Sequence, residues 1–167
     1  MDIGLLLVRV TVGLLMAAHG AQKLLGWFGG PGLARAAGLF EGLGFRPGRF
    51  FAATAAITEM SSGVLVAIGL FGPVGAALMV SVMIVAASVH WQNGLFATSN
   101  GIELPLLYGA VAAALTLMGP GGYSLDAVLG FSPAWTPALS WAALTFGVIG
   151  GAGNLALKRP IPQVAAA

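Results

Sequence analysis

The chemistry available to this chain depends on a few ionisable residues placed within or beside long apolar stretches. In hydrocarbon such groups cost roughly 2.5 to 3.5 kcal/mol each on insertion scales, so they are rare and face a packed interior or a wet cavity. A carboxylate or histidine in such a cavity could bind a proton, a metal ion or a polar head group such as a quinone carbonyl. The residues concerned are Arg9, His19, Lys23, Glu41, Glu59, His90 and Glu103.

The elements that must position these residues are membrane spans. Of the 167 residues, 58% are hydrophobic and only 7% are charged, whereas charged residues make up about 25% of a soluble domain. A span needs about 20 mostly apolar residues. The sequence therefore predicts an all-α polytopic bundle with no soluble domain. Its five predicted spans cover roughly residues 3–26, 50–70, 73–92, 102–119 and 135–157.

Several other classes of protein and site are excluded by composition. The net charge of +2 is small and the basic residues are scattered, which argues against nucleic-acid binding. The chain has no cysteine, so it forms no disulfide and no thiolate metal site. Asp2 stands where a signal peptide has its positive region, so we interpret the first apolar run as a retained helix.

Clusters of Gly and Pro separate the predicted spans. Between the first two spans, residues 33–44 carry apolar side chains at helical spacing, which predicts a short helix in the membrane interface; an ordered polar loop is the alternative. We divide the chain into a four-helix membrane core, residues 1–126, and a second part, residues 127–167. The second part holds an outer loop, the fifth span and a short cytoplasmic tail.

The basic residues predict the orientation of the bundle. Six of the seven fall on the side of the 27–49 loop and the C-terminus, and only Arg9 falls on the other side. Because basic residues accumulate in cytoplasmic loops, we expect the N-terminus outside and the C-terminus in the cytoplasm. The six residues are Lys23, Arg35, Arg46, Arg49, Lys158 and Arg159.

The helical rise places the ionisable residues in two layers. Lys23, His90 and Glu103 fall within about one helical turn of the cytoplasmic boundary, His19 about 10 Å deep and Glu59 about 15 Å deep. Arg9 enters from the outside and can reach the level of Glu59. On the first helix, Arg9, His19 and Lys23 share one stripe.

Two interpretations of these layers stay open. The first is an internal lattice that holds the helices together, with Arg9 paired to Glu59 and Lys23 to Glu103. The second is a ligand cavity formed by His19, Glu59, His90 and Glu103. A metal site is weakly indicated because the ligands come from separate helices without a spacing motif. A haem held by His19 and His90 is geometrically conceivable.

Other conspicuous residues suggest structural roles. Met79 and Met83 share a helix face and are expected to pack in the core. Gly147 and Gly151 form a pair suited to close helix packing, either within the bundle or between the protomers of a homo-oligomer. Asp126 is expected to be a solvated or capping acid.

Three combinations of residues carry a family resemblance. They are Arg9-x3-Gly13-x5-His19-Gly20-x2-Lys23, Thr58-Glu59-x3-Gly63 and Gly119-Pro120-Gly121-x-Tyr123-Ser124-Leu125-Asp126. With His90 and Glu103, they resemble the DoxX family of small bacterial membrane proteins over about residues 5–126. Members typically have a four-helix core, to which this chain adds a fifth helix. The motif residues of this resemblance fall on the polar layers described above, at Arg9, His19, Lys23, Glu59, His90 and Glu103.

The resemblance also implies a link to oxidoreductase systems. Some relatives are described as subunits of quinol oxidase or thiosulfate:quinone oxidoreductase assemblies, and others as membrane parts of oxidative-stress complexes. We therefore expect a subunit or anchor of a redox complex in the bacterial cytoplasmic membrane, with a quinone-like ligand among the first four helices. No flavin, haem or thiol motif is present, so an accessory role is expected rather than catalysis by this chain alone. The alternative is a small transporter or proton-coupled permease that uses the Glu59 and His19 layer.

Overall fold

The computed structural model describes residues 2–160 and is helical throughout, with no strand in that range. Short 3₁₀ turns cover Trp27–Gly29, Trp91–Asn93, Ala97–Ser99 and Ser132–Ala134. The fold is the polytopic helical bundle that the sequence predicts. The end of the predicted cytoplasmic tail, residues 161–167, lies outside the described residues. The helices are α1 (Asp2–Leu25), α2 (Gly32–Gly42), α3 (Gly48–Ile68), α4 (Val74–His90), α5 (Glu103–Met118), α6 (Leu125–Leu129) and α7 (Pro137–Ala156).

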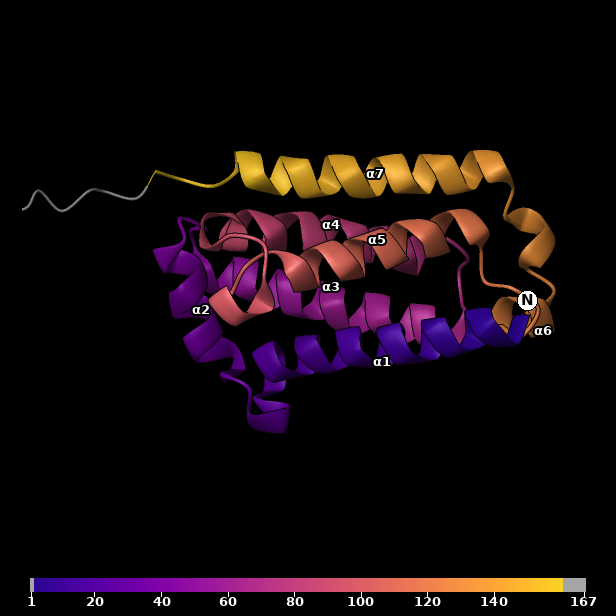
Figure 1. The fold of residues 1–167 in the computed structure, drawn as a ribbon, viewed down its shortest axis with the longest axis horizontal. Coiled ribbons are helices and arrows are strands. Elements are labelled where there is room, and N and C mark those ends of the chain that lie inside the picture. The colour runs from indigo at the N-terminus through magenta and orange to yellow at the C-terminus, as the bar shows by residue number, and fades with distance from the viewer. Residues whose placement is uncertain (1, 161–167) are drawn as a thin grey trace, which may run out of the picture.

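Helices α1, α3, α4, α5 and α7 run along the length of the bundle, and the shorter α2 and α6 lie at its ends (Figure 1). The packed pairs include α1 with α3, α3 with α4, and α4 with both α5 and α7. Helix α2 packs against α3 at the end where α1 stops, and α6 lies at the opposite end, near the N-terminus. The chain therefore enters at one end of the bundle and leaves α7 at the other, as an odd number of passes requires.

Within residues 2–160, four helices are long and apolar enough to cross a membrane: α1, α3, α7, and α4 with its 3₁₀ extension to Asn93. Helix α5, which corresponds to the fourth predicted span (residues 102–119), has 16 residues, or roughly 24 Å at 1.5 Å per residue. That length is short of a hydrocarbon core of about 30 Å. It is short because α5 stops at Gly119, whose φ is +75°, and Pro120 follows with no N–H to donate.

Helix α2 occupies the segment for which a short helix is predicted over residues 33–44. It runs from Gly32 to Gly42, so the alternative of a polar loop is wrong. The helix lies across the end of the bundle rather than along it (Figure 1). Its location in the membrane interface stays a prediction.

Helices α1 and α3 are in backbone contact through glycines. A Cβ on Gly13 would lie 2.6 Å from both the Gly63 carbonyl oxygen and the Ala67 nitrogen, and a Cβ on Gly20 would lie 2.5 Å from the Ala56 carbonyl oxygen. Small residues let helix backbones approach this closely in membranes, where dispersion and not the hydrophobic effect drives association. The α1–α3 pair is therefore the tightest structural unit around the ionisable residues.

Glycines on α7 allow close packing of this helix against α4 inside the bundle. A Cβ on Gly147 would lie 2.4 Å from the Ala77 carbonyl oxygen, and one on Gly151 would lie 2.9 Å from the Ser81 carbonyl oxygen. Both glycines are buried against α4, so they are not available as the contact of a homo-oligomer. Met79 and Met83 are part of the buried core, as predicted.

The α1–α3 contact predicts the effect of a single methyl group. Gly13→Ala should lower stability by roughly 1 to 3 kcal/mol, because the added carbon overlaps backbone atoms of α3 that cannot move aside. Thermal unfolding in mild detergent measures the loss. Gly4→Ala is the matched control on the same helix, since its Cβ would meet nothing within 4 Å. Equal destabilisation by the two substitutions would contradict this packing.

Candidate functional site

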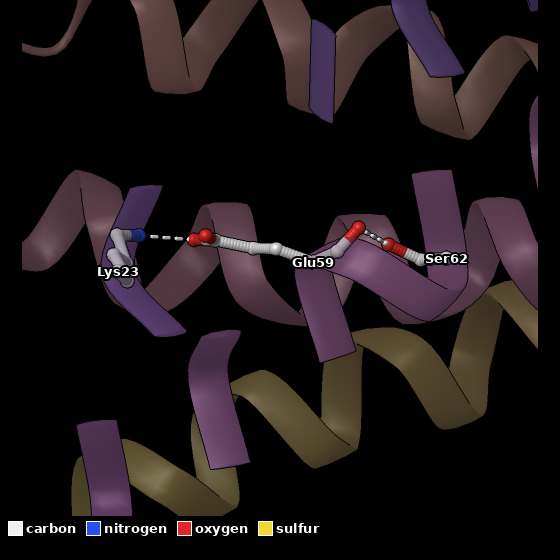
Figure 2. A network of polar contacts seen from close by, with 3 residues as sticks. All are labelled: Lys23, Glu59 and Ser62. Atoms are coloured by element: carbon white, nitrogen blue, oxygen red, sulfur yellow. Dashed lines mark hydrogen bonds and ion pairs between the residues drawn. The ribbon is translucent and has the colours of Figure 1, made fainter. Parts of the chain in front are cut away.

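The strongest polar contact in the bundle joins α1 to α3. Lys23 Nζ donates to Glu59 Oε1, and this is the salt bridge found among the described residues. The Lys23 side chain is 31% exposed, whereas that of Glu59 is only 2% exposed. Figure 2 shows the two side chains pointing toward one another, with Ser62 Oγ donating to the Glu59 backbone oxygen at 3.1 Å. The predicted pairs, Arg9 with Glu59 and Lys23 with Glu103, are therefore wrong.

Helix geometry explains why Lys23 reaches Glu59. Side chains on an α-helix tilt toward its N-terminus. Because α1 and α3 run in opposite directions (Figure 1), Lys23 leans toward the middle of the bundle and Glu59 leans back toward the end where α2 lies. The two charged groups therefore converge, although their Cα atoms lie at different depths.

The salt bridge provides a partner for only one of the two carboxylate oxygens of Glu59. Its second carboxylate oxygen, Oε2, is buried and has no hydrogen-bond partner within the described part of the chain. Burying an unpaired polar atom costs about 1 to 3 kcal/mol, and more for a charged group. Such an atom in a folded protein calls for an explanation, of which an unfilled binding site is one.

A cavity of about 670 Å³ lies beside the ion pair. Its wall comes from α2, the first half of α3 and the second half of α4, at the end of the bundle that α2 covers. The lining is mainly apolar and includes Phe40, Phe45, Phe51, Val82 and Val85. The polar residues in the wall are Lys23, Thr54, Thr58, Glu59, Ser81, His90, Asn93, Asn100 and Asn154.

Three of the six predicted site residues therefore line one cavity: Lys23, Glu59 and His90. The hydroxyl and amide groups of the wall were not predicted from the sequence. For Thr54 and Thr58 a signal was present, because residues four apart share a helix face and Glu59 follows directly. For Asn93, Asn100 and Asn154 no local pattern was available, since folding brings the 91–102 loop and α7 to the cavity.

His90 and Glu103 hold the loop between α4 and α5. His90 Nδ1 lies 2.9 Å from the backbone oxygen of Asn100, which also accepts a bond from Asn93 Nδ2. Glu103 Oε2 accepts from the Ala97 backbone N–H at 2.7 Å. Glu103 therefore orders the loop from the first turn of α5, and its predicted pairing with Lys23 is wrong.

Arg9 lies near the other end of α1 and bonds to backbone oxygens. Its Nε donates to Val66 at 3.1 Å and its Nη2 to Ala67 at 3.2 Å, while Nη1 donates to Pro120. Val66 and Ala67 belong to the last turn of α3, where carbonyl groups lack the usual i+4 partner; the Val66 oxygen also accepts from the Gly69 N–H at 3.2 Å. The predicted Arg9–Glu59 pair is wrong because these carbonyls, nearer to Arg9, satisfy its guanidinium.

Asp126 completes this outer end and is neither solvated nor exposed. It is fully buried and accepts from the Phe71 and Gly72 backbone N–H groups at 3.0 and 2.6 Å, and from Trp135 Nε1 at 2.7 Å. It thereby ties the segment after α5 to the α3–α4 turn and to the start of α7. Arg9 and Asp126 bond to backbone groups and to Trp135 at this end, away from Lys23 and Glu59, so the network expected across all six residues divides into separate parts.

His19 lies outside the cavity, on an exposed face of α1. Its ring meets Tyr108 of α5 edge-to-face, with centroids 5.9 Å apart. The layer of Glu59 and His19 on which the transporter alternative depends is therefore not formed. His19 and His90 do not share a cavity as a haem site would require. In residues 2–160, no group of three or more His, Asp or Glu side chains is arranged to hold a metal ion.

The ion pair predicts how substitutions combine. Lys23→Met should lower stability by up to about 3 kcal/mol, because it leaves Glu59 charged and unpaired in a low-dielectric setting. Adding Glu59→Gln removes the stranded charge and should restore much of the loss. Unfolding in mild detergent measures both. Arg9→Met and Glu59→Gln share no contact, so their effects should add; additivity for Lys23 and Glu59 instead would contradict the pair.

Comparison with known proteins assigns the chain to a family. A family model described as DoxX matches residues 4–91, more than half of the chain. The match covers α1 to α4, both partners of the ion pair and most of the cavity wall, and it stops before Glu103 and the 119–126 segment to which the resemblance extends. No curated protein and no solved structure matches. The chain belongs to the DoxX family of membrane proteins, which is often associated with redox- and stress-related systems.

Proposed function

We propose that this protein is a membrane subunit or anchor of a redox complex and that its cavity binds a quinone-like ligand. The observation that carries the proposal is the apolar cavity with the Lys23–Glu59 pair in its wall. In this arrangement the apolar part of the ligand packs among α2, α3 and α4, and its head group lies at the ion pair.

The dimensions and lining of the cavity support a small amphipathic ligand. A volume of about 670 Å³ is within the range of about 300 to 1,000 Å³ that is usual for small-molecule sites. Such sites are mostly apolar with a few polar groups that fix orientation. Phe40, Phe45 and Phe51 supply aromatic surface for a ring or chain, and Lys23 supplies a donor for a ring oxygen.

The position of the cavity supports a role within a larger assembly. It lies at the end of the bundle that the basic residues assign to the cytoplasm. A cytoplasmic partner could therefore exchange electrons with a ligand bound near that surface. In this proposal the present chain binds and orients the ligand, and the partner supplies the redox centre.

Filling the cavity tests the binding site. Val85→Trp should abolish binding of decylubiquinone, because the larger ring occupies the space between α3 and α4, while thermal stability in the same detergent stays near that of the wild type. Binding is measured by equilibrium titration of the purified protein. His19→Phe is the control, since it removes a polar group of α1 outside the cavity, and it should bind normally. Full binding by the Val85→Trp variant would contradict this site.

The proposed orientation has its own test. Reporter fusions after α7 and within the 119–136 segment should report the cytoplasm and the exterior, respectively, because six of seven basic residues sort to one side. A C-terminal fusion that reports an external location would show the orientation to be reversed. Equal signals from the two sites would mean that α7 does not span the membrane.

A further inference from the structure

The two charges in the cavity wall cancel. Lys23 contributes one positive and Glu59 one negative charge, bonded to each other. The Lys23 ammonium has three N–H donors. One of them donates to Glu59 Oε1, and the other two have no hydrogen-bond partner within residues 2–160. The wall therefore offers hydrogen-bond donors without a net charge.

This neutrality matters because of what surrounds the cavity. Anionic lipids give the cytoplasmic leaflet a negative surface potential that attracts basic groups. A lone lysine in an apolar cavity near that leaflet would bind a phosphate or carboxylate head group, with an acyl chain in the apolar space. The carboxylate of Glu59 opposes an anion at the same place, because a unit charge a few ångströms away still acts strongly in a low-dielectric interior.

The incomplete bonding of Glu59 argues against a purely structural role for the ion pair. A pair that served only to join α1 and α3 would be most stable with both carboxylate oxygens bonded, yet Oε2 is buried without a partner among the described residues. Backbone contacts at Gly13 and Gly20 already join these helices. The position of Glu59 in the cavity wall is therefore not required for the α1–α3 contact.

We propose that Glu59 determines the specificity of the cavity. By cancelling the charge of Lys23, it admits a neutral head group that accepts a hydrogen bond from Lys23, and it excludes anionic lipids and fatty acids. This inference rests on the proposed function and adds the chemical class of the head group. Glu59 acts through Lys23, so it is a positioning residue for the ligand.

The test compares two amphiphiles of equal chain length. Decylubiquinone has a neutral head that accepts hydrogen bonds, and decyl phosphate has an anionic head. Both are titrated against the purified wild type, Glu59→Gln and Glu103→Gln in neutral detergent. Glu103→Gln is the matched control, because it removes one negative charge outside the cavity and keeps an oxygen that can accept from Ala97.

We expect the wild type and Glu103→Gln to bind decylubiquinone at least about tenfold more tightly than decyl phosphate. Glu59→Gln should gain about tenfold or more in affinity for decyl phosphate, since Lys23 then carries an uncompensated charge. A folded Glu59→Gln protein without that gain would overturn the inference. So would a wild type that binds both amphiphiles equally, a result that decides the matter even if Glu59→Gln does not fold.

The outcome separates this inference from the proposed function. If the wild type binds neither amphiphile, the proposed quinone-like ligand is wrong and the inference fails with it. If the wild type binds both with similar affinity, the cavity is a ligand site as proposed and only the role assigned to Glu59 is wrong.

Discussion

A carboxylate buried in the middle of α3 needs a cation within reach, and this requirement governs the ion pair and the polar part of the cavity wall. Lys23 on α1 supplies this cation, because α1 and α3 run antiparallel and are in backbone contact. Glycines at positions 13, 20 and 63 permit that contact, and the tilt of the side chains brings the two charges together. Helix packing and the chemistry of the cavity are thus consequences of the same pair of helices.

The two ends of the bundle use polar residues in different ways. At the outer end, Arg9 and Asp126 are buried, and their hydrogen bonds go to backbone groups and to Trp135. These contacts satisfy carbonyl and amide groups that helix ends leave unpaired, which is essential where water is scarce. At the inner end, Glu59 keeps an oxygen without a partner beside a cavity of about 670 Å³. At the outer end, Arg9 and Asp126 find their hydrogen-bond partners within the described chain. At the inner end, the cavity beside Glu59 has room for a ligand.

The sequence predicts the helices well because apolar length and Gly-Pro breaks are local properties. It also predicts six polar site residues, since ionisable groups in hydrocarbon are costly, and three of them, Lys23, Glu59 and His90, line the cavity. The pairings were wrong for a physical reason. The pairs were predicted from the depth of each residue along its helix, which leaves out the direction in which the side chain leans. Backbone carbonyls were also not considered as partners for Arg9. Asp126 was misjudged because its partners lie more than 50 residues away at Phe71 and Gly72, and only the folded chain brings them together.

The central claim is that a neutral, quinone-like head group binds beside Lys23 in the cavity between α2, α3 and α4. Photolabelling with an azido-quinone, followed by mass-spectrometric mapping of the labelled peptides, tests this claim most directly. We expect labels within residues 51–59 of α3 and 81–90 of α4, and excess decylubiquinone should reduce them. Labels confined to the exposed face around His19 and Tyr108, with α3 and α4 unmodified, would contradict it.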